Sequence, residues 1–171
     1  VGRISTLQLG TLVIIGVLGA SFLIWQSPER QSRIDQYVNQ VVDINSEEFN
    51  TTDGYQAQQA HIAIAKGEVL GVGMGKSTQR DFLPAPYNDF IFAIIAEEYG
   101  LLGSVSLILL FSVILFRGIA KIAKNAPDTL GMLMAVGCTL TVVLYGFINA
   151  GVASGLLPVT GLPMPFVSYG G

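Results

Sequence analysis

Asp89 is the residue of this sequence whose type and position best suit chemistry. It stands immediately before an apolar run that starts at Phe90, and two further acids, Glu97 and Glu98, lie inside that run. Aspartate is a good helix N-cap, so a capping role is the simplest alternative for Asp89. Acids within a membrane-type segment are costly and usually mark a functional or partnered site. We therefore treat Asp89 as a candidate for acid–base chemistry and the two glutamates as candidate intramembrane residues.

Lys76 and Arg80 supply nearby positive charges, in and after a glycine-rich stretch with glycines at 71, 73 and 75. This stretch differs from a P-loop, because Leu70 occupies the position of the first P-loop glycine, and the third glycine of a GxGxxG pattern is also missing. We therefore expect no nucleotide. A tight turn with free backbone N–H groups beside two cations instead suits the approach of a phosphate group.

His61 and Cys138 are the single histidine and the single cysteine of the chain. Without a second His or Cys, His61 cannot build a conventional zinc site. Cys138 cannot form an intrachain disulfide and is expected to pack as a small apolar residue. Packing is the expected role of both side chains.

The composition is that of a membrane protein. Of 171 residues, 51% are hydrophobic and 12% are charged, and the net charge of −3 gives no electrostatic reason to expect nucleic acid. The apolar residues gather in three runs, 4–26, 90–116 and 129–152. Each run is long enough for the roughly 20 residues of a membrane-spanning helix. We predict an all-α integral membrane protein; the alternative for the first run, a signal peptide, lacks a clear cleavage pattern.

Basic residues predict the sidedness of these spans. Arg3 precedes the first run, and Arg117, Lys121 and Lys124 lie between the second and third runs, so both regions are expected in the cytoplasm. The predicted segments are a transmembrane helix (1–26), an extracytoplasmic loop with two short helices and the glycine-rich turn (27–88), an interfacial or transmembrane helix (89–118), a cytoplasmic loop (119–128), a transmembrane helix (129–153) and a second extracytoplasmic loop (154–171).

Local signals place the helices of the large loop. Ser27 followed by Pro28 is typical of an N-cap and a first helical position. Asp53 and Gln56 have the spacing of a capping box, and Gly67 is expected to end the helix that they begin.

Glycines and prolines mark where regular helix should stop. Gly100 and Gly103 would permit a bend in the second run, so that the true span starts near Tyr99 and the segment before it lies along the membrane interface. Prolines at 158, 163 and 165 exclude a regular helix near the C-terminal end of the sequence. An apolar, proline-rich segment at a membrane boundary has to be buried in protein or line a cavity.

Four ordered blocks resemble the SEDS family of bacterial membrane proteins (FtsW, RodA and SpoVE), and more closely FtsW than RodA. The blocks are Gly54-Tyr55-Gln56 with Gln59, the glycine-rich stretch with Gln79 and Leu83-Pro84, Asp89-Phe90-Ile91-Phe92 with Glu97-Glu98, and 155–171. The resemblance implies the C-terminal third of a bundle of about ten spanning helices, ending before the last helix. Ala85, Tyr87 and Asn88 depart from the family's usual Glu, His and Thr.

This resemblance implies an inverting peptidoglycan glycosyltransferase that polymerises lipid II at the bacterial inner membrane. Asp89 would be the general base, or a ligand of a Mg²⁺ or Mn²⁺ ion. The implied partners are a class B penicillin-binding protein, which is a transpeptidase, and other division proteins. The implied substrate-binding residues are Lys76, Arg80, Gln79, Gln56 and Ser168; the implied structural ones are Glu97, Glu98, Pro158 and Pro163.

Two other functions are compatible with these residues. A transporter of lipid-linked precursors would place charges near the membrane midplane, where only Glu97 and Glu98 are available. A non-catalytic scaffold of the division machinery would use small residues for close helix contacts, such as Gly131, Ala135, Gly151 and Gly155. In the enzyme hypothesis the isolated chain is expected to be inactive, because other helices of the family complete its cavity.

Overall fold

The computed structural model describes residues 5–42, 52–83 and 87–169, and these ranges contain helices and turns but no strand. The chain divides into two compact units, 1–47 and 48–171, which are described separately. Among the described residues, three helices are long and apolar enough to cross a membrane, at Leu7–Gln26, Ile91–Ala123 and Thr129–Ala153. The prediction of an all-α protein with three spanning helices is therefore confirmed.

The first unit contains α1 (Thr6–Gln26) and α2 (Pro28–Val42). A capping box starts α1, because the Ser5 hydroxyl accepts from the Gln8 amide and the Gln8 side chain accepts from the Ser5 amide. Pro28 occupies the first position of α2, as predicted. The large apolar side chains of α1 are exposed, which is the pattern of a helix that faces lipid or further helices.

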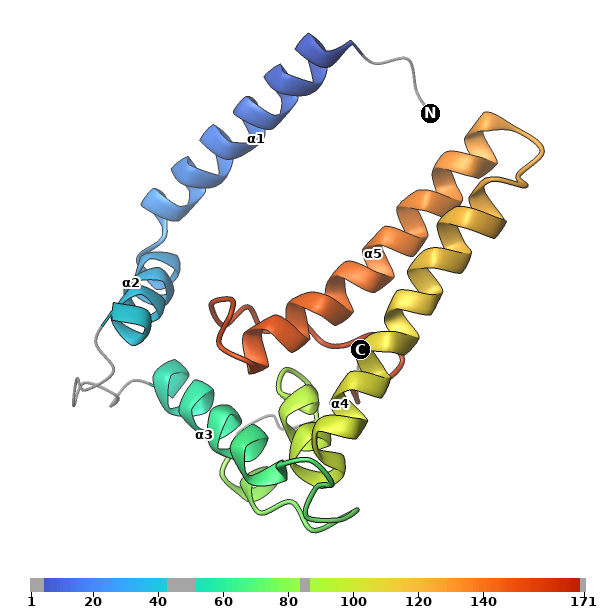
Figure 1. Ribbon diagram of the computed structural model, residues 1–171. Coiled ribbons are helices and arrows are strands. Elements are labelled where there is room, and N and C mark those ends of the chain that lie inside the picture. Colours follow the sequence, from blue (N-terminus) through green and yellow to red (C-terminus); the bar gives the residue numbers. More distant parts are fainter. Residues whose placement is uncertain (1–4, 43–51, 84–86, 170–171) are drawn as a thin grey trace. The chain divides into compact units, whose positions relative to one another are not determined.

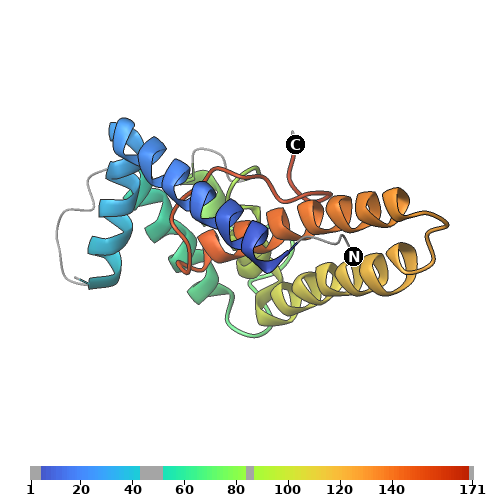
Figure 2. The same cartoon turned by 90° about the horizontal axis from the view of Figure 1, so that it is seen from above.

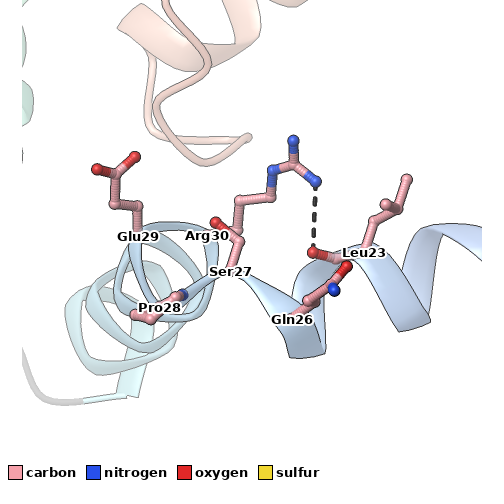
Figure 3. A pocket seen from close by; sticks show the side chains of 6 residues that line it. All are labelled: Leu23, Gln26, Ser27, Pro28, Glu29 and Arg30. Atoms are coloured by element: carbon pink, nitrogen blue, oxygen red, sulfur yellow. Dashed lines mark hydrogen bonds between the residues drawn. The ribbon is translucent and has the colours of Figure 1, made fainter.

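Side chains from the start of α2 bind the last carbonyls of α1. The Arg30 Nη1 donates to the Leu23 carbonyl at 3.3 Å, and the Gln31 Nε2 donates to the Trp25 carbonyl at 2.8 Å. A guanidinium suits this position, because the C-terminal end of a helix is partly negative. The junction forms a surface hollow lined by Leu23, Gln26, Ser27, Pro28, Glu29 and Arg30 (Figure 3). None of the predicted site residues lines this hollow.

The second unit contains α3 (Thr52–Gly67), the 3₁₀ turn η1 (Gln79–Asp81), α4 (Ile91–Arg117), its π-helical continuation η2 (Gly118–Ala123) and α5 (Thr129–Ala153). The ribbons of α4 and α5 run side by side and are joined by a short turn (Figures 1 and 2). The α3 helix packs against the first part of α4. Because η2 follows α4 without a gap, this helix ends at Ala123, five residues past the predicted end at 118.

The buried core of this unit lies where α3, the start of α4 and the end of α5 meet. Five core residues are each at most 1% exposed: Ala60 and Ala63 of α3, Phe90 at the N-cap of α4, Ala93 of α4 and Ala153 of α5. Elsewhere α4 and α5 expose many large apolar side chains. In a membrane, such surfaces contact lipid or neighbouring helices.

Small residues allow α4 and α5 to approach closely. A Cβ on Gly118 would lie 2.3 Å from the Thr139 Oγ1, and a Cβ on Gly146 would lie 2.6 Å from the Phe111 ring. Contacts of this kind are typical of helix packing in membranes, where small residues let backbones come together. Cys138, which was expected to pack, is exposed on α5 instead.

Candidate functional site

The spanning helix α4 is broken at Gly100, which adopts φ 66° and ψ −159°. The carbonyls of Glu97 and Glu98 lie on the N-terminal side of the break. Instead of bonding within the helix, they accept hydrogen bonds from the amides of Val72 and Gly73, at 2.9 and 3.1 Å. The glycine-rich loop thus supplies the donors that the helix has lost.

The other side of the break is satisfied by the same loop. In a continuous helix the amides of Leu101 and Leu102 would bond to the carbonyls at 97 and 98. Here they donate to the carbonyls of Glu68 and Val69, at 2.9 and 3.3 Å. Four loop bonds replace two helix bonds, so the broken backbone leaves none of these four groups unsatisfied, as a membrane-embedded segment requires.

Three glycines make room for this insertion. A Cβ on Gly67 would lie 1.8 Å from the Ala96 carbonyl oxygen, and one on Gly71 would lie 2.1 Å from that of Glu98. Gly71 and Gly100 both have positive φ, and their backbones touch, since a Cβ on Gly100 would lie 2.5 Å from the Gly71 nitrogen. A side chain at any of the three would push the loop out of the helix break. Of the two geometries that the sequence allowed, a continuous helix and a helix bent near Gly100, the bent one is present, and the loop is bonded at the bend.

The Glu97 side chain holds the next part of the loop. Its carboxylate is fully buried (0% exposed) and accepts four hydrogen bonds: from the Ser77 hydroxyl (2.5 Å), the Thr78 amide (3.1 Å), the Thr78 hydroxyl (3.0 Å) and the Gln79 amide (3.2 Å). A buried carboxylate is tolerated when its oxygens are satisfied in this way. Glu97 thus anchors the turn that leads into η1.

Lys66 reaches the same anchor from α3. Its Nζ donates to the Thr78 Oγ1 at 2.5 Å, and that oxygen in turn donates to Glu97. Lys66 lies in the last turn of α3, where its positive charge complements the helix dipole. Its ammonium also places a positive charge one hydroxyl away from the buried carboxylate.

The two candidate phosphate-binding cations lie at either end of this anchored turn. Lys76 is exposed, and its side-chain stem lies beside Gly73. Arg80 lies in η1, 3.5 Å from the Asp81 carboxylate. A side-chain hydrogen bond with Tyr87, and then the charge of Asp81, raise the pKa of Arg80 above its ordinary value.

Asn149 of α5 binds the backbone of Asp89. Its Nδ2 donates to the Asp89 carbonyl at 2.9 Å and to the Leu162 carbonyl at 2.8 Å, and the residue is 1% exposed. Asp89 itself is half-buried, and its Oδ2 lies 3.6 Å from the place that a Cβ on Gly161 would occupy. The amide thus ties the candidate base to the proline-rich loop after α5.

Two further bonds join this loop to the residues before Asp89. The Ser168 hydroxyl donates to the Asn88 carbonyl at 2.7 Å and accepts from the Met164 amide at 2.8 Å. The Tyr169 amide donates to the Tyr87 carbonyl at 2.9 Å. Ser168 was predicted to bind substrate, and in this arrangement its oxygen already bridges two backbone groups.

The remaining predicted residues take different places. Gln79 is buried (7% exposed) with its side-chain oxygen unpartnered among the described residues, and Gln56 on α3 is half-buried. Glu98 is half-buried, and its backbone carbonyl accepts a hydrogen bond from the Gly73 amide. Pro158 and Pro163 lie half-buried in the non-helical segment after α5.

His61 packs as predicted. A Cβ on Gly155 would lie 2.5 Å from the His61 Nε2, which is buried and has no hydrogen-bond partner in the described part of the chain. Burial lowers the pKa of His61 below 6.5, because the charged imidazolium loses water. Gly155, which was proposed for close helix contacts, therefore lies against the His61 ring of α3.

The sequence reasoning missed Asn149, Ser77 and Thr78. A lone asparagine in an otherwise apolar spanning run was the available signal, since polar groups in such runs are costly unless they are bonded. For Ser77 and Thr78 the pattern gave no comparable signal. Their partner Glu97 was predicted to be structural, which is consistent with the four bonds it accepts.

The described residues supply only part of what a metal site requires. Within 5–42, 52–83 and 87–169, no group of three or more His, Cys, Asp or Glu residues is arranged to hold an ion. Mg²⁺ is often bound by one or two carboxylates together with substrate phosphates. Asp89 could supply one such carboxylate, and a substrate pyrophosphate could supply further oxygens.

The fold and the site define a multi-pass α-helical membrane protein with a structured loop anchored in a broken spanning helix. The chain belongs to the cell cycle protein family of FtsW, RodA and SpoVE, whose model matches residues 1–171. This confirms the resemblance drawn from the four sequence blocks and the multi-pass membrane location.

Individual relatives are similar over nearly the whole chain. Stage V sporulation protein E of Bacillus subtilis (strain 168) is 44% identical over 161 residues, which cover 94% of this chain and 42% of the relative. The probable peptidoglycan glycosyltransferase FtsW of Nitrosococcus halophilus (strain Nc4) is 41% identical, over 94% of this chain and 41% of the relative. The chain therefore spans about two fifths of the length of these relatives.

A solved structure has the same fold. It is described as "Structural coordination of polymerization and crosslinking by a peptidoglycan synthase complex", and it superposes with a TM-score of 0.63 at 25% identity. The match covers 96% of this chain and 44% of that one.

Proposed function

We propose that the protein to which this chain belongs is a peptidoglycan glycosyltransferase that polymerises lipid II. Family membership and the names of the relatives support this activity. In this proposal Asp89 is the general base. Lys76 and Arg80 offset the negative charge of the pyrophosphate that leaves.

The reaction is a transfer of a glycosyl group from a pyrophosphate to a sugar hydroxyl. Asp89 takes the proton of the acceptor 4-hydroxyl, whose oxygen attacks the anomeric carbon of the donor sugar. The bond from this carbon to the pyrophosphate oxygen breaks, and the electron pair leaves with the pyrophosphate. Because the attack and the departure occur on opposite faces, the configuration is inverted. A good leaving group makes a general acid unnecessary.

One observation carries the proposal: the start of α4 holds both parts of this machinery. Asp89 stands just before the helix, and Glu97, about two turns further on, anchors the turn between Lys76 and Arg80 through four hydrogen bonds. A base and cations fixed to one rigid element keep a set geometry, and positioning is a large part of catalysis.

The engagement of Glu97 favours an enzyme over a transporter. A transport site was expected to use Glu97 and Glu98, since they are the charges within the spans. The Glu97 carboxylate is instead saturated by loop donors and fully buried. A hydrolase is also less well supported. It would need a second carboxylate across the scissile bond, and the candidate Asp81 is exposed and pairs with Arg80.

A divalent cation would supply further charge stabilisation for the pyrophosphate when it is bound. In that case Asp89 would be its ligand within this chain. A single-span transpeptidase of the class B penicillin-binding type is the proposed partner. The solved relative, described as a peptidoglycan synthase complex, supports a partner of this kind.

The test uses the full-length protein purified with this partner and supplied with purified lipid II. We expect Asp89→Asn to insert into membranes and to bind the partner but to make no glycan polymer on a gel. The matched control is Asp35→Asn, which alters an exposed carboxylate of α2 and should leave polymer yield unchanged. Polymer from Asp89→Asn at the wild-type rate would refute the assignment. Repeating the assay with EDTA and with added Mg²⁺ or Mn²⁺ tests the cation.

A further inference from the structure

Asn149 has the burial and the bonding of a residue that fixes the active-site backbone. It lies in the spanning helix α5 and is 1% exposed, and its Nδ2 donates to the carbonyls of Asp89 and Leu162. Both partners are carbonyl oxygens, which can only accept. The orientation of the amide is therefore determined: its NH₂ group faces these two carbonyls.

The two acceptors belong to segments that are far apart in the sequence. Asp89 begins the approach to α4, whereas Leu162 follows Gly161 in the loop after α5. Gly161 has φ +67°, and the Asp89 Oδ2 lies 3.6 Å from the place of its absent Cβ. One amide group thus sets the distance between the Asp89 backbone and the loop that its carboxylate faces.

The two carbonyls that precede that of Asp89 are also held. Those of residues 87, 88 and 89 accept, in order, from the Tyr169 amide, the Ser168 hydroxyl and Asn149. Of these three donors, Asn149 alone belongs to a spanning helix. Ser168 and Tyr169 belong to the loop itself and can move with it, so Asn149 is the link between this assembly and the rigid frame.

We propose that Asn149 is a positioning residue that holds Asp89 at the angle and depth needed to meet the acceptor hydroxyl. The inference rests on the proposed function of Asp89 and adds the residue through which α5 controls it. Asn149 acts through the backbone and does not touch the substrate. Small displacements of a reacting group, of about 1 Å, can cost around 100-fold in rate.

The test compares three substitutions at this position in the full-length protein with its partner. Asn149→Leu has a similar size but no donors, Asn149→Asp replaces the donors by acceptors, and Asn149→Ser retains one donor. We expect kcat to fall about 10- to 100-fold for Leu and Asp, with KM for lipid II changed less than about threefold, and Ser to recover part of the loss. The pH profile of kcat should also shift, because Asp89 changes its surroundings.

The control is Thr141→Val, which alters an exposed residue of α5 whose hydroxyl bonds to the Gly137 carbonyl of its own helix. It should retain wild-type kcat. A purely structural role for Asn149 would lower the amount of folded protein while the surviving molecules kept the wild-type kcat and pH profile, and this result would overturn the inference. Polymerisation by Asp89→Asn would instead overturn the proposed function, so the two failures are distinguishable.

Discussion

The buried carboxylate of Glu97 and the hydroxyl of Ser77 are joined by a 2.5 Å hydrogen bond that spans 20 residues of sequence. It is one of four bonds to the same carboxylate, and the Glu97 carbonyl also accepts from Val72. Side chain and backbone of one helical residue therefore hold two consecutive parts of the loop. Glu97 converts a glycine-rich segment, which would otherwise be flexible, into a fixed part of the site.

Glu97→Gln should loosen this loop. The amide retains one oxygen but presents an NH₂ group to donors that need an acceptor, and a buried group left unsatisfied costs about 1–3 kcal/mol. We expect hydrogen exchange at the amides of Thr78 and Gln79 to become about tenfold faster or more. Glu98→Gln is the control, because the half-buried neighbour contributes its carbonyl, which the substitution leaves in place. Equal exchange in both variants would contradict the anchoring role.

Gly100→Ala should disrupt the junction between the loop and α4. The substitution puts a Cβ within 2.5 Å of the Gly71 nitrogen, in a backbone conformation with φ +66° that L-residues avoid. We expect a loss of at least about 2 kcal/mol in the free energy of unfolding, measured as a shift of the thermal transition in detergent. Gly137→Ala on α5, where nothing lies within 4 Å of the new Cβ, should leave the transition nearly unchanged. A stable Gly100→Ala protein would mean that the break tolerates a side chain.

His61 should make the stability of the second unit depend on pH. Burial lowers its pKa in the folded state below the ordinary value of 6.5. As the pH falls through 6.5, the unfolded chain therefore takes up a proton that the folded chain does not, and the free energy of unfolding decreases until the lowered pKa is reached. Above 6.5 the group makes no contribution.

This dependence is measured by thermal unfolding between pH 7.5 and pH 5, values chosen to bracket the unfolded pKa. We expect the wild-type transition to fall more steeply over this interval than that of His61→Gln, which cannot titrate. The difference between the two proteins removes the contribution of every other titrating group. Parallel curves would show that His61 takes up its proton equally in both states.

The spanning helices could be predicted from sequence because burial in lipid requires long apolar runs, and these runs coincide with α1, α4 and α5. The bend at Gly100 was also predictable as a local property of glycine. The exchange of hydrogen bonds across this bend was not, because the partners at 68–73 lie far away along the chain and no local pattern specifies them.

In the candidate site, too, local features could be predicted from the sequence and tertiary contacts could not. Asp89 and Glu97 stood out as acids beside or within an apolar run. Their partners did not, since Ser77 and Asn149 are ordinary polar residues whose importance depends on tertiary contacts. Close helix contacts were expected at Gly131 among others, but that glycine lies beside the Asp128 cap of α5. The capping box predicted at Asp53 and Gln56 lies partly outside the described side chains.

Lys76→Ala should impair polymerisation without affecting stability. The Lys76 side chain is exposed, so its loss should change the free energy of unfolding by less than about 0.5 kcal/mol. If its ammonium offsets the charge that develops on the leaving pyrophosphate, the full-length protein should lose about tenfold or more in kcat/KM with lipid II. Lys76→Arg should retain much of the activity, because the charge is kept.

The matched control for this prediction is Lys124→Ala, which removes an exposed cation from the turn between η2 and α5. Under the predicted topology this turn faces the cytoplasm, away from lipid II at the outer face, so its removal should leave kcat/KM unchanged. An equal loss in both variants would indicate a general effect of net charge. An unchanged kcat/KM for Lys76→Ala would refute a role for Lys76 and leave Arg80, in η1, as the proposed cation for the pyrophosphate.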